Sequence, residues 1–246
     1  MTFLSRATGL ALFLGGAAAL VGHFVWVGPM AGPLKLGQDA AIVVGNGHAF
    51  LGSESPAAQD GLKVWAVTPA GDSQPVAVSV ADKYLKGSFP VKAEGVYRVV
   101  FTQDRGVMSR TPKGVKAGGR DQHPDATEAF KLFRSGIAFI GTPGKVWGKE
   151  KPVGLEFEAV PEKTADGVIL TVFAGGKPLA GVDISLAWPL KDELDLGKTG
   201  ADGKFTYKFP AGAKSPALFV AETKVKAAAG AKFDVHTYAS AIALYW

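Results

Sequence analysis

The sequence contains no cysteine among its 246 residues. Disulfide bonds, thiolate nucleophiles and thiolate-ligated metal centres are therefore all excluded. Any metal ion in this protein has to be held by histidine, by carboxylates or by backbone atoms. Histidine is itself scarce, because the chain has only four, so the position of each one matters.

Charged residues are also few, at 20% of the chain, and the net charge of +5 comes from lysines spread along its whole length. The sequence has neither an arginine-rich stripe nor a block in which basic and aromatic residues alternate. Proteins that bind nucleic acids commonly carry one of these patterns. We therefore expect no nucleic-acid partner.

Motifs of the common catalytic sites are missing as well. The sequence has no Gly-x-Ser-x-Gly, no His-Glu-x-x-His, no phosphate-binding glycine loop and no calcium loop. Glu156 and Glu158 fall on one face of a predicted strand, and we interpret them as a solvent-facing pair rather than as an acid and a base. The sequence thus predicts a protein that is not an enzyme.

What the chain does contain favours strands and tight turns. It has 32 glycines and 15 prolines, and 47% of its residues are hydrophobic. The pattern after Gly45-Asn46-Gly47 and that around Ala201-Asp202-Gly203 are typical of hairpin turns. Strands are predicted where apolar residues alternate or run between turns, at residues 34–36, 41–44, 62–67, 76–80, 85–91, 96–102, 137–140, 155–160, 169–173, 182–188, 217–222 and 237–244.

These elements predict an all-β protein made of two Ig-like or transthyretin-like β-sandwich modules. The first module covers residues 23–103 and the second covers residues 137–246. Between them, residues 104–136 are basic and rich in glycine, and Asp125-Ala126-Thr127-Glu128 resembles a capping box. We therefore expect a basic loop followed by one short helix between the modules.

Residues 1–22 resemble a secretory leader, because Arg6 is followed by the apolar run 7–21. Cleavage after Ala19 fits the small-residue rule best, whereas cleavage after Gly22 would make His23 the first residue. Its new α-amine and its imidazole would then form a compact nitrogen site for a divalent metal. Alternatively, the leader stays as an anchor helix and is the chain's only membrane contact. Each outcome predicts a periplasmic or otherwise exported protein.

Several short phrases resemble the DUF4198 family of exported proteins linked to nickel or cobalt uptake. They are His23-Phe24-Val25-Trp26, Gly47-His48-Ala49-Phe50, the phrase at residues 154–161, and the phrases at residues 176–182 and 199–205. The last two are shared with carboxypeptidase-regulatory-like and transthyretin-like folds. The resemblance implies two periplasmic β-sandwiches and a role in handling a divalent transition metal. It also implies a membrane metal-transport system as partner.

The metal hypothesis rests on His23, His48 and His123. His23 and His48 each stand between a glycine and a nearby aromatic residue, and we expect this pair to bind nickel or cobalt. His123 lies in the predicted loop, and His236 is expected on the solvent face of a strand. The alternative is a structural or adhesion module that binds a protein or a cell-wall glycan, in which the histidines have no function.

Overall fold

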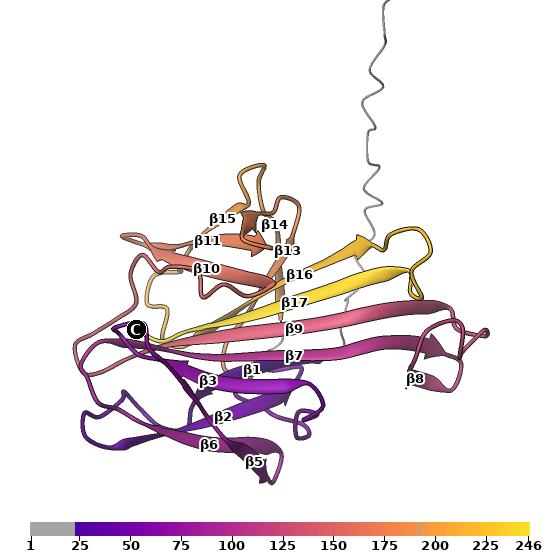
Figure 1. Cartoon of the computed structure of the whole chain (residues 1–246). Helices are drawn as coiled ribbons and strands as arrows, with labels where there is room; N and C mark the ends of the chain where they lie inside the picture. Colours follow the sequence, from indigo (N-terminus) through magenta and orange to yellow (C-terminus); the bar gives the residue numbers. More distant parts are fainter. Residues whose placement is uncertain (1–22, 192) are drawn as a thin grey trace, which may run out of the picture.

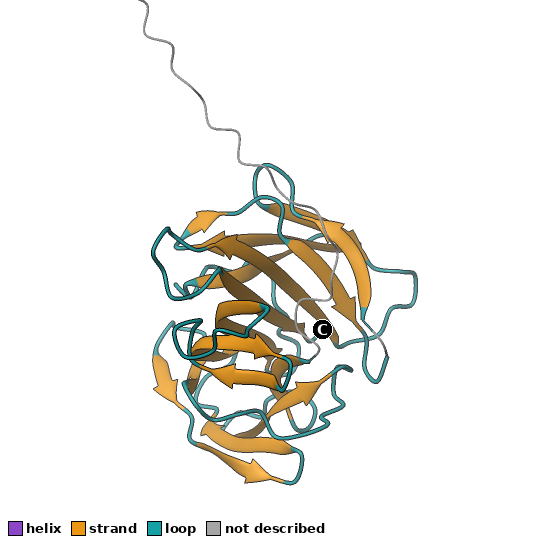
Figure 2. Ribbon diagram, turned by 90° about the vertical axis from the view of Figure 1, so that its right-hand side faces the viewer, coloured by secondary structure: helices purple, strands orange, loops and turns teal. Residues whose placement is uncertain are grey.

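The computed structural model describes residues 23–191 and 193–246, and in this part of the chain it consists of strands joined by turns, without any helix (Figures 1 and 2). The all-β class predicted from the sequence is therefore confirmed. No candidate membrane-spanning helix is present among these residues. The predicted leader or anchor at residues 1–22 lies outside the described part.

A nine-stranded sheet forms the middle layer of the molecule (Figure 1). Its neighbours are antiparallel except for β9 and β17, which run parallel and join strands from the two halves of the chain. One continuous sheet therefore serves both halves. In spatial order it contains β14 (Leu194–Lys198), β13 (Asp183–Ala187), β16 (Ala217–Lys226), β17 (Val235–Leu244), β9 (Glu128–Gly141), β7 (Val96–Thr111), β3 (Leu62–Val67) and β4 (Ser73–Pro75), with β8 (Gly114–Ala117) paired to β7.

A smaller sheet covers each face of this middle layer. In β16, Leu218 and Val220 belong to one hydrophobic core, whereas Phe219 and Ala221 belong to the other. This alternation follows from the two-residue period of a strand, so the two sandwiches share their central layer. The first outer sheet contains β1 (Phe24–Pro29), β2 (Asp39–Gly47), β6 (Tyr84–Pro90) and β5 (Val78–Ala81); the second contains β10 (Phe157–Lys163), β11 (Gly167–Ala174), β12 (Lys177–Pro178) and β15 (Lys204–Lys208).

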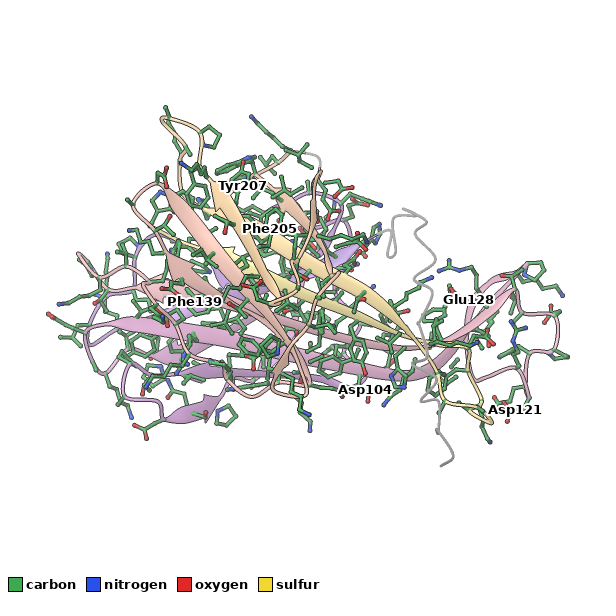
Figure 3. All side chains as sticks on the ribbon, turned by 90° about the horizontal axis from the view of Figure 1, so that it is seen from above. Asp104, Asp121, Glu128, Phe139, Phe205 and Tyr207 are labelled. Atoms are coloured by element: carbon green, nitrogen blue, oxygen red, sulfur yellow. The ribbon has the colours of Figure 1, made fainter. Side chains whose placement is uncertain are left out.

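The prediction of a short helix between the modules is wrong, because residues 128–136 belong to β9 and the residues just before them form a turn. Phe130 and Leu132 pack with Met108 of β7 in a small core of their own, whereas Phe133 points into the second large core. Strands β7 and β17 pair with β9 on both sides and satisfy its backbone groups. Tertiary pairing therefore overrides the local capping signal. The result is an extended arm, on which Glu128 and Asp121 lie far from Phe139 in the body (Figure 3).

Two predicted hairpin turns also differ from the structure. The backbone of Gly45-Asn46-Gly47 continues β2, because it pairs with β1. Gly45 is needed for packing, since a Cβ atom there would lie 2.3 Å from the Trp26 ring. The Ala201-Asp202-Gly203 turn is present, but it passes the chain from β14 in the central sheet to β15 in an outer sheet.

Glu158 contradicts the expectation of a solvent-facing pair with Glu156. Only 1% of Glu158 is exposed. Its carboxylate accepts hydrogen bonds from the backbone N–H groups of Val153 and Gly154, each at 2.8 Å, and of Leu155 at 3.1 Å. Glu156 remains exposed and accepts a hydrogen bond from the Tyr238 hydroxyl. The buried carboxylate therefore fastens the segment that leads into β10.

We predict that Glu158→Gln lowers the free energy of unfolding by about 2–3 kcal/mol, because an amide retains one acceptor oxygen and turns a donor group toward backbone donors. Urea denaturation monitored by tryptophan fluorescence measures this change. Glu156→Gln is the matched control and should cost less than about 1 kcal/mol. Equal effects of the two substitutions would contradict the assigned role of Glu158.

Candidate metal centre

The pairing of β1 with β2 brings His23 and His48 together. The antiparallel register places Phe24 opposite Gly47, so the residues just beyond this pair, His23 and His48, face each other. Their ring centroids lie 4.2 Å apart and their planes are nearly perpendicular, at 85°. Residues that oppose each other across two antiparallel strands are close enough for their side chains to touch. Strand pairing thus creates a histidine pair from residues 25 positions apart in the sequence.

A short loop after β2 returns Glu54 to this pair. Gly52 donates a backbone hydrogen bond to Ala49 at 3.1 Å, and Glu54 donates one to Asn46 at 2.9 Å. The return is tight, because a Cβ atom on Gly47 would lie only 2.7 Å from the Gly52 carbonyl oxygen. A side chain at position 47 would therefore push the loop, and Glu54 with it, away from the histidines.

Ser53 anchors the returning loop, and only 8% of this residue is exposed. Its hydroxyl accepts a hydrogen bond from the Asn46 N–H at 2.9 Å and donates one to the Lys83 carbonyl at 2.7 Å. The Tyr84 hydroxyl donates to the Leu51 carbonyl at 3.2 Å. These bonds connect the loop to β2 and to the start of β6, so the position of Glu54 is set by the fold rather than by chance contacts.

The Glu54 carboxylate lies between the two imidazoles. Its Oε1 lies 2.8 Å from His48 Nδ1 and also accepts a hydrogen bond from the backbone N–H of His48 at 3.0 Å. Its Oε2 lies 3.2 Å from His23 Nε2. Hydrogen bonds from the His48 side chain, and then from its backbone, hold the pKa of Glu54 below its ordinary value. The carboxylate is therefore ionised at neutral pH and available as a ligand.

Together, one ligand atom from each of His23, His48 and Glu54 can be chosen so that all three lie within 4.8 Å of one another. Two imidazole nitrogens and a carboxylate oxygen are suitable ligands for zinc, nickel, cobalt and copper. Bonds of about 2.0–2.2 Å to a single ion require the ligand atoms to approach to roughly 3–3.4 Å. The side chains are 36%, 60% and 50% exposed, respectively, so small rotations can close the remaining gap.

The other two histidines lie elsewhere. His123 sits in the connection between β8 and β9, and its Nε2 is 2.8 Å from the Ala117 carbonyl oxygen. His236 is half-buried in β17, where its ring stacks on Tyr238 and meets the edge of Phe233. The structure thus brings together His23 and His48 but not His123. It adds Glu54, for which the sequence offers no signal, because its approach depends on the Ser53 anchor.

A half-buried arginine and a half-buried glutamate lie behind His23. Arg134 donates a hydrogen bond to the His23 carbonyl at 3.4 Å and lines, together with Glu222, a cavity of about 10 Å³. Burial lowers the pKa of Arg134 to about 10. Burial, and then the charge of Glu193, raise the pKa of Glu222 to about 7, while Arg134 opposes this shift. Glu222 is therefore partly protonated near neutral pH.

This pKa makes stability depend on pH. Because the pKa of Glu222 is raised from 4.5 to about 7, the folded state binds more protons than the unfolded state between these values, and stability falls as the pH rises through this window. Glu222→Gln cannot ionise. We predict that the difference in the free energy of unfolding between this variant and the wild type shifts in favour of the variant by about 2–3 kcal/mol as the pH rises from 4.5 to 8. Urea denaturation of both proteins across this pH range measures the difference. Stability curves of the variant and the wild type that run parallel with pH would contradict the prediction.

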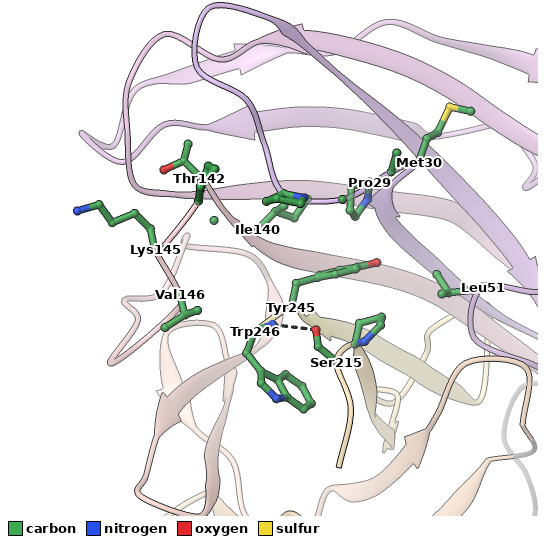
Figure 4. Close-up of a pocket in the computed structure, with 17 residues that line it drawn as sticks. Pro29, Met30, Leu51, Ile140, Thr142, Lys145, Val146, Ser215, Tyr245 and Trp246 are labelled. Carbon is green, nitrogen blue, oxygen red and sulfur yellow. Dashed lines mark hydrogen bonds between the residues drawn. The ribbon is translucent and has the colours of Figure 1, made fainter. Parts of the chain in front are cut away.

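A larger pocket, of about 520 Å³, lies apart from the histidines (Figure 4). It is bounded by the segment after β1, the turn after β9 and the end of the chain, and the Tyr245 ring crosses it. The Trp246 N–H donates a hydrogen bond to the Ser215 hydroxyl beside it. Leu51 is the one residue of the Glu54 loop that reaches this pocket. The candidate metal ligands therefore sit on the open surface and not in this pocket.

Comparison with known proteins finds one family. The model of a family described as "Domain of unknown function (DUF4198)" matches residues 20–213. No curated protein matches the chain. Among solved structures, a DUF4785 family protein from Legionella pneumophila subsp. pneumophila str. Philadelphia 1 is 11% identical, with a TM-score of 0.31. The alignment covers 82% of this chain and 54% of that protein, so the chain spans about half of its length.

Proposed function

The chain belongs to the DUF4198 family, and we propose that it is an exported, non-enzymatic protein that binds a divalent transition metal and supports the uptake of that metal. The single observation that carries this proposal is the His23–His48–Glu54 cluster. We propose nickel or cobalt as the metal, on the resemblance of the two histidine phrases to proteins linked to the uptake of these ions. Both ions accept imidazole and carboxylate ligands.

The openness of the cluster suits a protein that passes its metal on. Structural metal sites are usually closed by four protein ligands, whereas three ligands leave positions for water or for a ligand from another molecule. Here the His48 side chain is 60% exposed, and that of Glu54 is 50% exposed. A receiving protein can reach such an ion directly. This geometry supports a role in metal delivery to a membrane transport system.

Metal binding by this cluster does not require a free amine on His23. The Nε2 atom of His23 faces Glu54, at 3.2 Å, whereas a chelate with the residue's own amine would use Nδ1. We therefore propose that the cluster binds metal whether the chain begins at His23 or further upstream. A protein starting at His23 and one with Gly22 retained should have affinities that agree within about threefold.

We predict that the wild-type protein binds Ni²⁺ or Co²⁺ with a dissociation constant far below the millimolar range. Replacement of His23 or His48 by Ala, or of Glu54 by Gln, should weaken binding at least about tenfold each, because one of three ligands is lost. Acidification should weaken wild-type binding, because protons compete for the imidazole nitrogens. Isothermal titration calorimetry measures these changes.

His123→Ala is the matched control for this experiment, because His123 bonds to the Ala117 carbonyl and takes no part in the cluster. Its affinity should equal that of the wild type. The metal proposal would be overturned if the wild type bound the metal only with millimolar affinity and if this affinity were the same in His23→Ala, His48→Ala, Glu54→Gln and His123→Ala.

The second candidate function is the docking of a protein or glycan partner. It is favoured by the exposed edge of the central sheet, where Leu194 of β14 is 55% exposed. Unpaired backbone groups and apolar side chains on an edge strand can pair with another chain. This function would leave the histidines without a role, so wild-type behaviour of the His23, His48 and Glu54 variants in metal titration would favour it.

A further inference from the structure

We propose that Asn46 is a positioning residue that selects which ring nitrogen of His23 is free to bind the metal. The inference rests on the proposed function and assigns a role to a side chain that is not itself a ligand. Asn46 lies two residues before His48 in β2 and opposite Val25 of β1, so both strands of the site hold it in place. Its side-chain Nδ2 lies 3.5 Å from His23 Nδ1 and 3.1 Å from the Ser55 hydroxyl oxygen.

Two hydrogen bonds hold the backbone of Asn46 in place. Its N–H donates to the buried Ser53 hydroxyl at 2.9 Å, and its carbonyl accepts the Glu54 N–H at 2.9 Å. The amide group therefore has one main freedom, which is a half-turn that exchanges its oxygen and nitrogen. Either orientation can satisfy Ser55, because a hydroxyl both donates and accepts.

The amide orientation determines the tautomer of His23. With Nδ2 facing the ring, Asn46 donates to Nδ1, so the single ring proton of neutral His23 sits on Nε2 and is donated to Glu54 Oε2 at 3.2 Å. This arrangement ties His23 and Glu54 together in the metal-free protein. It also blocks the nitrogen that faces Glu54, because a protonated Nε2 has no lone pair for a metal.

A half-turn of the amide reverses this arrangement. The Asn46 Oδ1 atom then faces the ring and accepts a hydrogen bond from Nδ1–H, which leaves the Nε2 lone pair directed at the metal. Metal-binding histidines in proteins almost always donate their second ring N–H to such an acceptor. The proton balance is closed, since Nε2 releases one proton to solvent and Nδ1 takes one up. Metal binding and the orientation of the Asn46 amide are therefore linked.

Two substitutions at position 46 separate the two orientations. Asn46→Leu keeps the approximate volume but offers neither donor nor acceptor, and we expect it to weaken Zn²⁺ binding about 10–100-fold. Asn46→Asp offers only acceptors, so it should hold His23 with its proton on Nδ1 even without metal. We expect Asn46→Asp to bind Zn²⁺ at least as tightly as the wild type. Ser55→Asp is its control, because it adds the same charge nearby but can only accept from the Asn46 Nδ2, so it should leave the metal-free His23 proton on Nε2.

The direct readout is the tautomer of His23, measured by long-range ¹H–¹⁵N NMR of its imidazole nitrogens, with Zn²⁺ as a diamagnetic probe. We expect the wild type to change from Nε2–H without metal to Nδ1–H with zinc, and Asn46→Asp to show Nδ1–H in both states. A purely structural role of Asn46 would leave these tautomers unchanged among folded variants.

Two results would overturn the inference. One is an Nδ1–H tautomer in the metal-free wild type, and the other is wild-type zinc affinity in Asn46→Leu. Failure of the proposed function would give a different result, because the wild type would then bind no zinc at all. In that case the tautomers of His23 in the metal-free wild type and in Asn46→Asp would still test the role of Asn46.

Discussion

The contact of the Trp26 indole with Gly45 is the constraint on which the candidate site depends. A Cβ atom at position 45 would lie 2.3 Å from this ring, so Trp26 has to sit opposite a glycine. A slip of one residue would place the indole over Val44 or Asn46 and would turn each side chain of β1 to the opposite face. The register that Trp26 selects is also the register that places His23 opposite His48. Core packing thus determines the geometry of a surface site.

The loop that supplies Glu54 carries a conformational cost that its surroundings offset. Leu51 has a φ of 64°, and Leu190, which lies against this loop, has a φ of 55°. A left-handed conformation costs a residue with a side chain roughly 1–2 kcal/mol. The Tyr84 hydroxyl bonds to the Leu51 carbonyl, and the Leu190 N–H donates to the Phe50 carbonyl at 2.8 Å. These contacts hold in place a loop that its own sequence does not favour, and strain of this kind is common near functional sites.

The sequence predicted those features that depend on local pattern. Alternation identified residues 62–67, which form β3 without any shift in its bounds. Local signals failed where contacts with other segments decided the outcome. The capping box at residues 125–128 was overridden by the pairing of β9 with β7 and β17, and Glu158 is buried because a neighbouring segment folds over it. The histidine pair was predictable as two similar phrases. Glu54 was not, because its approach to the histidines depends on hydrogen bonds that Ser53 makes to Lys83, thirty residues away.

The most direct test of this account is the position of a bound ion. Crystals of the protein grown with Ni²⁺ or Co²⁺, measured at the absorption edge of the metal, give an anomalous difference map that locates the ion independently of the protein coordinates. We expect one main peak within about 2.0–2.3 Å of nitrogen atoms of His23 and His48 and an oxygen atom of Glu54. A main peak at His123 or His236, or no peak at the cluster at millimolar metal, would contradict it.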